Sequence, residues 1–521
     1  MATFLLEHSD RDRPELGVVA STRPNSQAIR RLASLLGVTG FLVSFAGSWI
    51  PSLWGDEAAS VMSAERSLPS LFDMVMHVDA VHGTYYLLLH FWVDLFGASP
   101  VSVRLPSALA VGFAVAGTVL LANELFSRRV ATIAGILSVL LPRFTYMGAE
   151  ARSYAWSAAA AVLLTYLIVK LVRARSSKKI AWIVYAVGLA LGIYLFLYLA
   201  LLIVVHGVYL LVSRPERHTI RRWTLATLLG VLLSTPIIVV AITQRHQIAF
   251  LAHRTRVTVA QIVSGQWFDG RWIDGHGVNS PVLGVSWLAV ACWALIAVAV
   301  IAAARGHYRR IPMVLVGAWL VLPTVILLAG NAMLAPMYTN RYLSFCAPAA
   351  AILVAAGIAA LPRRWMRGAA IVIVLSLVLP GYIAQRTEFG KPGGSDWAAV
   401  SAVIGHDARP GDAIVFDNSV KPSWRPRLAM HTYPEDYRGL NDVALLTPFE
   451  QTTGLWDSVE PLPQVASRLV GVSRVWALET KGTDQKSAGS DLRVLAADGF
   501  TVITEIPIHR TIVYELVRSS S

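Results

Sequence analysis

Long apolar runs separated by short basic segments dominate roughly the first 390 residues of the chain. A helix needs about 17 to 25 mainly apolar residues to cross a bilayer. Runs of this length lie near 31–50, 104–126, 130–147, 153–173, 223–243, 286–304, 312–330, 342–361 and 367–385. The pattern predicts a polytopic α-helical membrane protein.

Clusters of Lys and Arg indicate which ends of these runs are cytoplasmic. They lie at 30–31, 128–129, 170–179, 214–222, 305–310 and 363–367. The apolar stretch 180–213 has such clusters on both sides, so it must cross an even number of times, and we expect two short spans that turn near Tyr198. Residues 85–97 are too short to cross, and we expect a helix in the outer interface. The prediction is about eleven transmembrane helices, with the N-terminus inside and the C-terminus outside.

The pattern changes after Phe389, where "GKPGGSDW" reads as a linker. Short β-rich runs at 413–417, 474–480, 500–506 and 511–517 predict strands, and 396–406 and 490–498 have helical spacing. We therefore expect three parts: a disordered cytosolic tail at 1–28, a transmembrane catalytic domain at 29–388 and an extracytoplasmic α/β domain at 389–521. Within the second part, 51–103 forms the first outer loop, with interfacial helices.

Composition agrees with a membrane protein. Of 521 residues, 55% are hydrophobic and only 15% are charged, with a mean hydropathy of +0.56, which excludes an ordinary soluble protein. The net charge of +13 resides in the short basic loops, so it gives no reason to expect nucleic acid as a partner. The two cysteines, Cys292 and Cys346, lie in apolar runs and support neither a disulfide framework nor a cysteine metal site.

Two adjacent acids, Asp56 and Glu57, follow the first span in "WGDEAAS". Charges near a bilayer are costly and tend to be functional. Neighbouring side chains on a helix diverge by about 100°. We therefore expect different roles, with one acid facing a pocket and the other holding a partner or capping the helix.

Further polar residues gather on the predicted outer face. Asp79 and His82 precede a tyrosine pair that begins at Tyr85, and Arg152 and Arg341 each lie at the outer end of a span. Arginine suits phosphate because its planar fork donates two parallel hydrogen bonds. A carboxylate opposite such arginines could deprotonate an attacking hydroxyl while the cations hold an anionic leaving group. The residues thus indicate an outer-face transferase or transporter that uses a lipid phosphate.

Five motifs occur in the order seen in glycosyltransferases of the GT-C fold. They are "WGDEAAS", "VDAVHGTYYLLLHFWVDLFG", "VRLPSALAVG", "EARSYA" and "NRYLSFCAP". Over roughly residues 31–390 the chain resembles this family, in particular the bacterial branch similar to protein O-mannosyltransferases and aminoarabinose transferases. The resemblance implies an inverting transfer from a polyprenyl-phosphate sugar to an acceptor hydroxyl on the extracytoplasmic side of the bacterial plasma membrane.

The resemblance also implies roles for single residues. Asp56 matches the general base, and Glu57 matches the second acid of that catalytic pair. The positions matching donor-binding residues are Asp79, His82, Tyr85, Arg152 and Arg341. One departure concerns the turn at His82, where relatives commonly have His-Pro-Pro-Leu-Tyr-Tyr and this chain has no proline, which loosens the turn.

Several alternatives stay open. No cofactor is required, but Asp56, Glu57, Asp79, His82 and His276 could supply ligands to a divalent cation. Arg104 could be a snorkelling interface residue, His206 is expected to be an interhelical hydrogen bonder, and the segment 266–277 could grip the acceptor or be a surface loop. The favoured sugar is mannose, with arabinose second, and the expected acceptor is a cell-envelope glycan or glycolipid. A transporter or flippase of a lipid-linked sugar is the alternative function, and a scaffold with an outer binding domain is a third reading.

Overall fold

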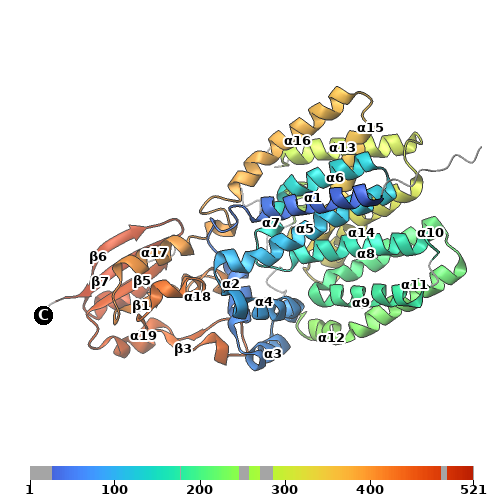
Figure 1. Cartoon of the computed structure of the whole chain (residues 1–521). Helices are drawn as coiled ribbons and strands as arrows, with labels where there is room; N and C mark the ends of the chain where they lie inside the picture. The colour runs from blue at the N-terminus through green and yellow to red at the C-terminus, as the bar shows by residue number, and fades with distance from the viewer. Residues whose placement is uncertain (1–25, 176–177, 246–256, 270–284, 483–489, 520–521) are drawn as a thin grey trace, which may run out of the picture.

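The structure is a computed structural model that describes residues 26–175, 178–245, 257–269, 285–482 and 490–519. Most of the tail predicted at 1–28 lies outside these residues. A bundle of long helices forms one end of the molecule and a sheet with short helices forms the other (Figure 1).

Among the described residues, seven helical segments are long and apolar enough to cross a membrane. They are α1 (Ser26–Phe45), α5 (Pro100–Leu125), α8 (Tyr154–Arg173), α13 (Trp287–Ala304), α14 (Arg310–Met333), α15 (Ala347–Ala360) together with the preceding turn η5 (Asn340–Cys346), and α16 (Arg364–Ala384). The chain is therefore a multi-pass integral membrane protein.

Two bent helix pairs raise this number to nine if each pair is one span. The first is α6 (Arg128–Leu140) with α7 (Pro142–Gly148), bent by 54°, and the second is α11 (Arg217–Leu233) with α12 (Thr235–Thr243), bent by 50°. A proline stands in the first turn of both α7 and α12. Since proline has no N–H and its ring clashes with the preceding turn, it bends the helix there.

The stretch 180–213 forms two shorter apolar helices, as expected. Helix α9 (Lys179–Leu195) ends at Phe196, and the turn η2 (Leu197–Leu201) leads into α10 (Leu202–Ser213). His206 on α10 bonds the hydroxyls of Tyr185, at 2.8 Å, and Thr165, at 3.2 Å, which confirms its interhelical role.

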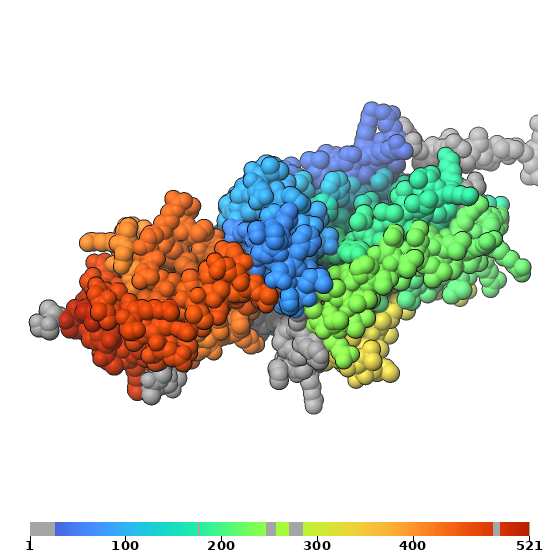
Figure 2. Space-filling view, turned by 90° about the horizontal axis from the view of Figure 1, so that it is seen from below, coloured from blue at the N-terminus to red at the C-terminus, as the bar shows by residue number. Residues whose placement is uncertain are grey.

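The loop between α1 and α5 folds into short helices, α2 (Gly55–Glu65), α3 (Leu68–His77), η1 (Ala80–His82) and α4 (Gly83–Phe96). In Figure 2 these blue residues lie between the orange and red C-terminal part and the green helices. This loop is the structural link between the two ends of the molecule.

The C-terminal part holds a five-stranded mixed sheet of order β2-β1-β5-β7-β6. Strands β2 (Asn441–Asp442), β1 (Ala413–Phe416) and β5 (Arg474–Thr480) are parallel, and β7 (Thr511–Arg518) and β6 (Phe500–Pro507) complete the sheet in antiparallel register. Helices α17 (Trp397–Asp407) and α20 (Asp491–Ala497) lie where the sequence predicts them, and the four predicted strands are confirmed. Smaller elements are α18 (Leu428–Thr432), α19 (Leu462–Val465), the hairpin β3 (Leu445–Thr447) and β4 (Ser458–Val459), and the turns η6 (Pro392–Gly394), η7 (Pro422–Trp424), η8 (Pro434–Tyr437), η9 (Phe449–Gln451) and η10 (Ala466–Leu469).

The hydrophobic core of the sheet continues onto α2. Ala58 and Met62 of α2 belong to the same buried cluster as Trp397 and Phe416. At the start of α2, Gly55 lies so close to η7 that a Cβ there would be 2.1 Å from the carbonyl oxygen of Ser423. The C-terminal part is thus packed directly against the helix that carries the acid pair.

Candidate active site

Helix α2 begins at the acid pair predicted from the sequence. Asp56 and Glu57 occupy its first turn, where carboxylates interact favourably with the helix dipole. Asp56 is partly exposed and Glu57 is fully buried. The divergence expected for neighbouring helical residues therefore gives the two acids different surroundings.

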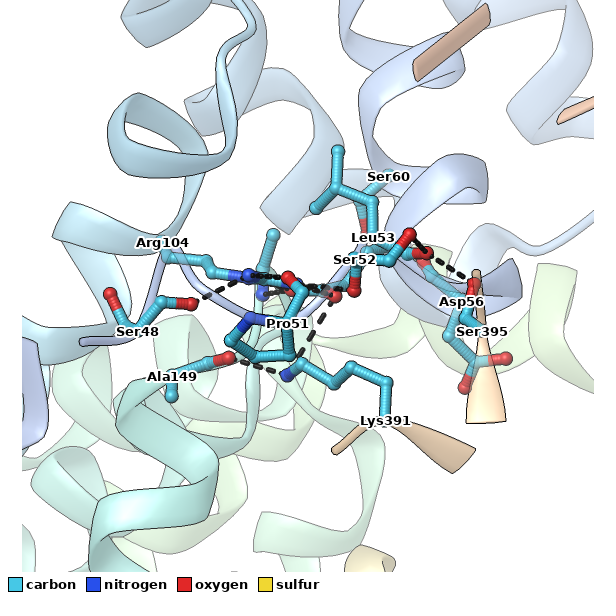
Figure 3. A network of polar contacts seen from close by, with 12 residues as sticks. Ser48, Pro51, Ser52, Leu53, Asp56, Ser60, Arg104, Ala149, Lys391 and Ser395 are labelled. Atoms are coloured by element: carbon cyan, nitrogen blue, oxygen red, sulfur yellow. Dashed lines mark hydrogen bonds and ion pairs between the residues drawn. The ribbon is translucent and has the colours of Figure 1, made fainter. Parts of the chain in front are cut away.

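Glu57 pairs with Arg104 of α5 in a fully buried bidentate contact. The Nε–Oε1 distance is 2.7 Å and the Nη2–Oε2 distance is 2.5 Å. The other guanidinium N–H groups of Arg104 donate to the carbonyls of Ser48, Pro51 and Ser52 at 2.6 to 3.1 Å (Figure 3). An arginine has five N–H donors, and all of them are bonded here. Arg104 is therefore a buried structural residue, and the snorkelling interpretation is wrong.

Glu57 also binds two segments that follow membrane helices. Its Oε1 accepts a hydrogen bond from the Ala151 backbone N–H at 2.9 Å, and its Oε2 lies 3.7 Å from Nζ of Lys391. Lys391 in turn donates to the Ala149 carbonyl at 2.5 Å (Figure 3). Burial would raise the pKa of Glu57, but Arg104 and Lys391 outweigh it and lower that pKa. The Glu57 carboxylate thus holds the polar framework around the site.

Asp56 lies on the other side of this framework. Its Oδ2 forms an ion pair with Nη1 of Arg341 at 2.5 Å. The guanidinium of Arg341 lies 5.3 Å from the ring centroid of Trp54, the residue that precedes α2. Both residues are predicted from the sequence to lie on the outer face, and in the structure Asp56 and Arg341 are in direct contact.

Arg152 lies beside this ion pair. Its Nη1 donates to the Tyr86 hydroxyl at 3.0 Å and, at 3.3 Å each, to the Ser60 hydroxyl and the Asp56 carbonyl. The Tyr86 hydroxyl in turn donates to the Asp79 carboxylate. Burial raises the pKa of Asp79, although Arg152 and Tyr86 oppose the shift. Asp79 therefore contacts Arg152 through Tyr86.

The remaining predicted residues surround this chain of contacts. His82 is buried, and burial together with Arg152 moves its pKa well below the usual range, so its ring is neutral. Tyr85 is buried in an apolar cluster that includes Leu71. Its neighbour Tyr86, which the sequence did not single out, is the tyrosine that contacts both Arg152 and Asp79.

Buried polar atoms without a hydrogen-bond partner among the described residues are concentrated here. They include the hydroxyls of Tyr146 and Tyr154, both carboxylate oxygens of Glu150, Nε of Arg152 and Nδ1 of His82. Buried polar groups are nearly always paired in folded proteins, with substrates and ordered water among the partners. This concentration indicates a polar substrate site.

The metal hypothesis gains no support from the described residues, which contain no group of three or more His, Cys, Asp or Glu side chains able to hold a metal ion. Glu57 is already bonded to Arg104, and His276 lies outside the described residues. Of the segment 266–277, the described part ends the π-helix η4 (Gln261–Asp269), where Gln266 is buried and bonded to Thr324 and Tyr338. The rest of that segment lies outside the described residues.

Comparisons with known proteins confirm the resemblance. Residues 84–242, from α4 to α12, match the family model described as dolichyl-phosphate-mannose-protein mannosyltransferase. The fold is similar to that of ArnT from Cupriavidus metallidurans in the apo state, with a TM-score of 0.58, 14% identity, and coverage of 92% of this chain and 97% of ArnT. The structure of the same protein bound to undecaprenyl phosphate gives a TM-score of 0.57 at 15% identity, with the same coverage. No curated protein sequence matches the chain. The chain thus has a GT-C fold.

Proposed function

We propose that the chain is a membrane glycosyltransferase that moves a sugar from a polyprenyl-phosphate donor to an acceptor hydroxyl on the extracytoplasmic face. The observation that carries the proposal is the convergence of Asp56, Arg152 and Arg341 around buried unpaired polar atoms. In ArnT the same fold has been observed with undecaprenyl phosphate bound. Two buried arginines next to a carboxylate fit a lipid phosphate on one side and a nucleophilic hydroxyl on the other.

The contacts indicate a separate role for each residue in the reaction. Arg152 and Arg341 hold the donor phosphate, and Arg341 exchanges its ion pair with Asp56 for one with the phosphate. The released Asp56 carboxylate accepts the proton of the acceptor hydroxyl as its oxygen bonds to the anomeric carbon. The bond from that carbon to the phosphate oxygen breaks with its electron pair, and polyprenyl phosphate leaves, so the configuration at the anomeric carbon inverts.

The other predicted site residues act around this centre. Glu57 positions α2 through its contact with Arg104. It therefore holds Asp56 in place and does not exchange a proton itself. Asp79 orients Arg152 through Tyr86, and His82 and Tyr85 line the donor pocket next to them. No metal is needed in this scheme because the two arginines carry the positive charge.

The proposed topology has eleven crossings. Seven long apolar segments, two bent pairs and the two shorter apolar helices together make this number among the described residues. With the basic loops cytoplasmic, the N-terminus lies inside, and 29–388 is the catalytic domain of a bacterial plasma-membrane protein. The domain at 389–521 then lies outside, beside the active site.

Mannose is the first candidate for the sugar, supported by the description of the matching family model, and arabinose is the second. The acceptor we propose is a cell-envelope glycan or glycolipid. A flippase of a lipid-linked sugar would need polar residues along a path through the bilayer, whereas the predicted site residues gather at one end of the helices.

The test uses the full chain in nanodiscs with radiolabelled polyprenyl-phosphate mannose or polyprenyl-phosphate arabinose and an envelope glycolipid extract. We expect label transfer from one donor by the wild type and by Asp73→Asn, a matched control at an exposed acid in the same loop. Asp56→Asn should transfer label at least about a hundredfold more slowly than the wild type. Binding of a donor without transfer by the wild type would favour a flippase and overturn the proposal.

A further inference from the structure

Glu150 is a buried acid that the proposed reaction does not use. It follows α7, its residue is 1% exposed, and both carboxylate oxygens have no hydrogen-bond partner among the described residues. Four residues earlier, on α7, the hydroxyl of Tyr146 is also buried and unpaired, and it interacts electrostatically with Glu150. Leaving such groups unsatisfied is costly, so two of them side by side indicate that a ligand supplies the missing hydrogen bonds.

The charges around Glu150 indicate the chemistry of that ligand. Lys391 lies 5.2 Å from the Tyr146 ring centroid, and it already donates to the carbonyl of Ala149. Burial raises the pKa of Glu150, and the nearby carboxylate of Glu57 raises it further, against the opposing effect of Lys391. A carboxyl group accepts a hydrogen bond in either protonation state and also donates one when it is protonated. The unpaired carboxyl group of Glu150 and the unpaired hydroxyl of Tyr146 fit a neutral ligand rich in hydroxyl groups, because each can bond a hydroxyl.

The position of Glu150 distinguishes the donor sugar from the acceptor. Glu150 interacts electrostatically with Arg341, the proposed phosphate ligand. The transferred sugar is attached directly to that phosphate, so its ring must lie within reach of the same arginine. Tyr146 lies on α7 of the bent pair α6 and α7, so the proposed subsite includes a residue of a membrane helix, as a site for a lipid-linked donor requires.

We infer that Glu150 and Tyr146 form a subsite that hydrogen-bonds the ring hydroxyls of the donor sugar and sets which sugar is transferred. The inference rests on the proposed function. A site built to bond a hydroxyl strongly rejects an analogue without it, because its own buried polar groups are then left unpaired. The subsite therefore acts on sugar identity, separately from the phosphate contact of Arg152 and Arg341.

The experiment compares Tyr146→Phe and Glu150→Gln with the wild type in nanodiscs. Each protein is tested for binding of polyprenyl phosphate, of the polyprenyl-phosphate sugar that the wild type transfers, and of deoxy analogues of that donor lacking one ring hydroxyl each. Tyr308→Phe is the control, because its hydroxyl bonds the Ala356 carbonyl at 2.7 Å near the predicted cytoplasmic end.

Both variants should bind polyprenyl phosphate as the wild type does and bind the sugar donor at least about tenfold more weakly. The discrimination against one deoxy donor should also fall at least about tenfold, while Tyr308→Phe changes neither quantity. Unchanged donor binding and discrimination in both variants would overturn the subsite, as would an equal loss of polyprenyl phosphate and sugar-donor binding. If Glu150→Gln does not fold, Tyr146→Phe alone decides, since it removes a single hydroxyl. Failure of the proposed function is distinguishable, because the wild type itself would then transfer no sugar.

Discussion

Replacing Glu57 by glutamine tests whether this acid is structural. The substitution keeps the size of the side chain but removes the charge that faces Arg104, whose side chain is fully buried. The glutamine NH₂ group would also point toward a guanidinium N–H or toward Lys391, which are all donors. Breaking one partner of a buried pair typically costs about 3 to 5 kcal/mol. Since total stabilities are of the order of 5 to 15 kcal/mol, the loss should be large.

The assay is chemical denaturation of the purified protein in mixed micelles, reporting the free energy of unfolding. Glu505→Gln, at an exposed position on β6, is the matched control and should change that free energy by no more than about 0.5 kcal/mol. A Glu57→Gln protein that unfolds like the wild type would refute the structural role, and any loss of its activity would then indicate that Glu57 takes part in the chemistry.

A double variant, Glu57→Leu with Arg104→Met, sharpens the test. Replacing a buried ion pair by apolar residues is often neutral. Here the carbonyls of Ser48, Pro51 and Ser52 would also lose their donors, at about 1 to 3 kcal/mol for each group left unsatisfied. We therefore expect no rescue, and full recovery of stability would show that these carbonyl contacts contribute little.

Three further predictions concern the C-terminal domain and its contact with α2. Burial raises the pKa of Glu479 to about 8, above its unfolded value, so the free energy of unfolding should fall as pH rises from about 4.5 to about 8. Glu479→Gln should weaken this pH dependence, as measured by amide hydrogen exchange in β5 corrected for the intrinsic rate. The guanidinium of Arg66, at the end of α2, donates to the carbonyls of Thr452 and Gly454 at 2.8 and 2.5 Å. Arg66→Ala should lower kcat without weakening donor binding, and Arg66→Lys should restore part of the lost kcat. Equal losses of kcat and of donor binding would contradict a positioning role for Arg66. Gly55→Ala should destabilise the protein by about 1 to 3 kcal/mol, because the added Cβ would overpack against η7. The same change at a helical glycine with open space around it should leave stability unchanged. Thermal unfolding of the two variants and the wild type measures the difference.

The membrane helices and the strands follow from local sequence signals. Length and hydropathy determine whether a segment can cross a bilayer, and the strands at 474–480 and 511–517 are short β-rich runs bounded by polar residues. The bends at Pro142 and Pro236 were also readable in principle, since a proline in the middle of an apolar run interrupts a helix. Length and hydropathy alone predict one span in each run, at 130–147 and 223–243, and do not indicate its bend.

The partners of the site residues could not be predicted in the same way. Glu57 and Arg104 are 47 positions apart, and Lys391 comes from the segment after the last membrane helix. Such contacts depend on how the helices pack, which no local pattern encodes. The choice between Tyr85 and Tyr86 shows the same limit, because both are aromatic neighbours and only their three-dimensional surroundings distinguish them.

In the proposed reaction Asp56 is the base, and Arg341 leaves its ion pair with Asp56 to bind the donor phosphate. The most direct measurement compares donor binding and turnover of wild type and Asp56→Asn in the same nanodisc preparation. Loss of a general base should lower kcat by a factor of about 10² to 10⁴. Donor binding should be unchanged or tighter, because the ion pair that competes for Arg341 is gone. Wild-type turnover in Asp56→Asn would show that Asp56 is not the base.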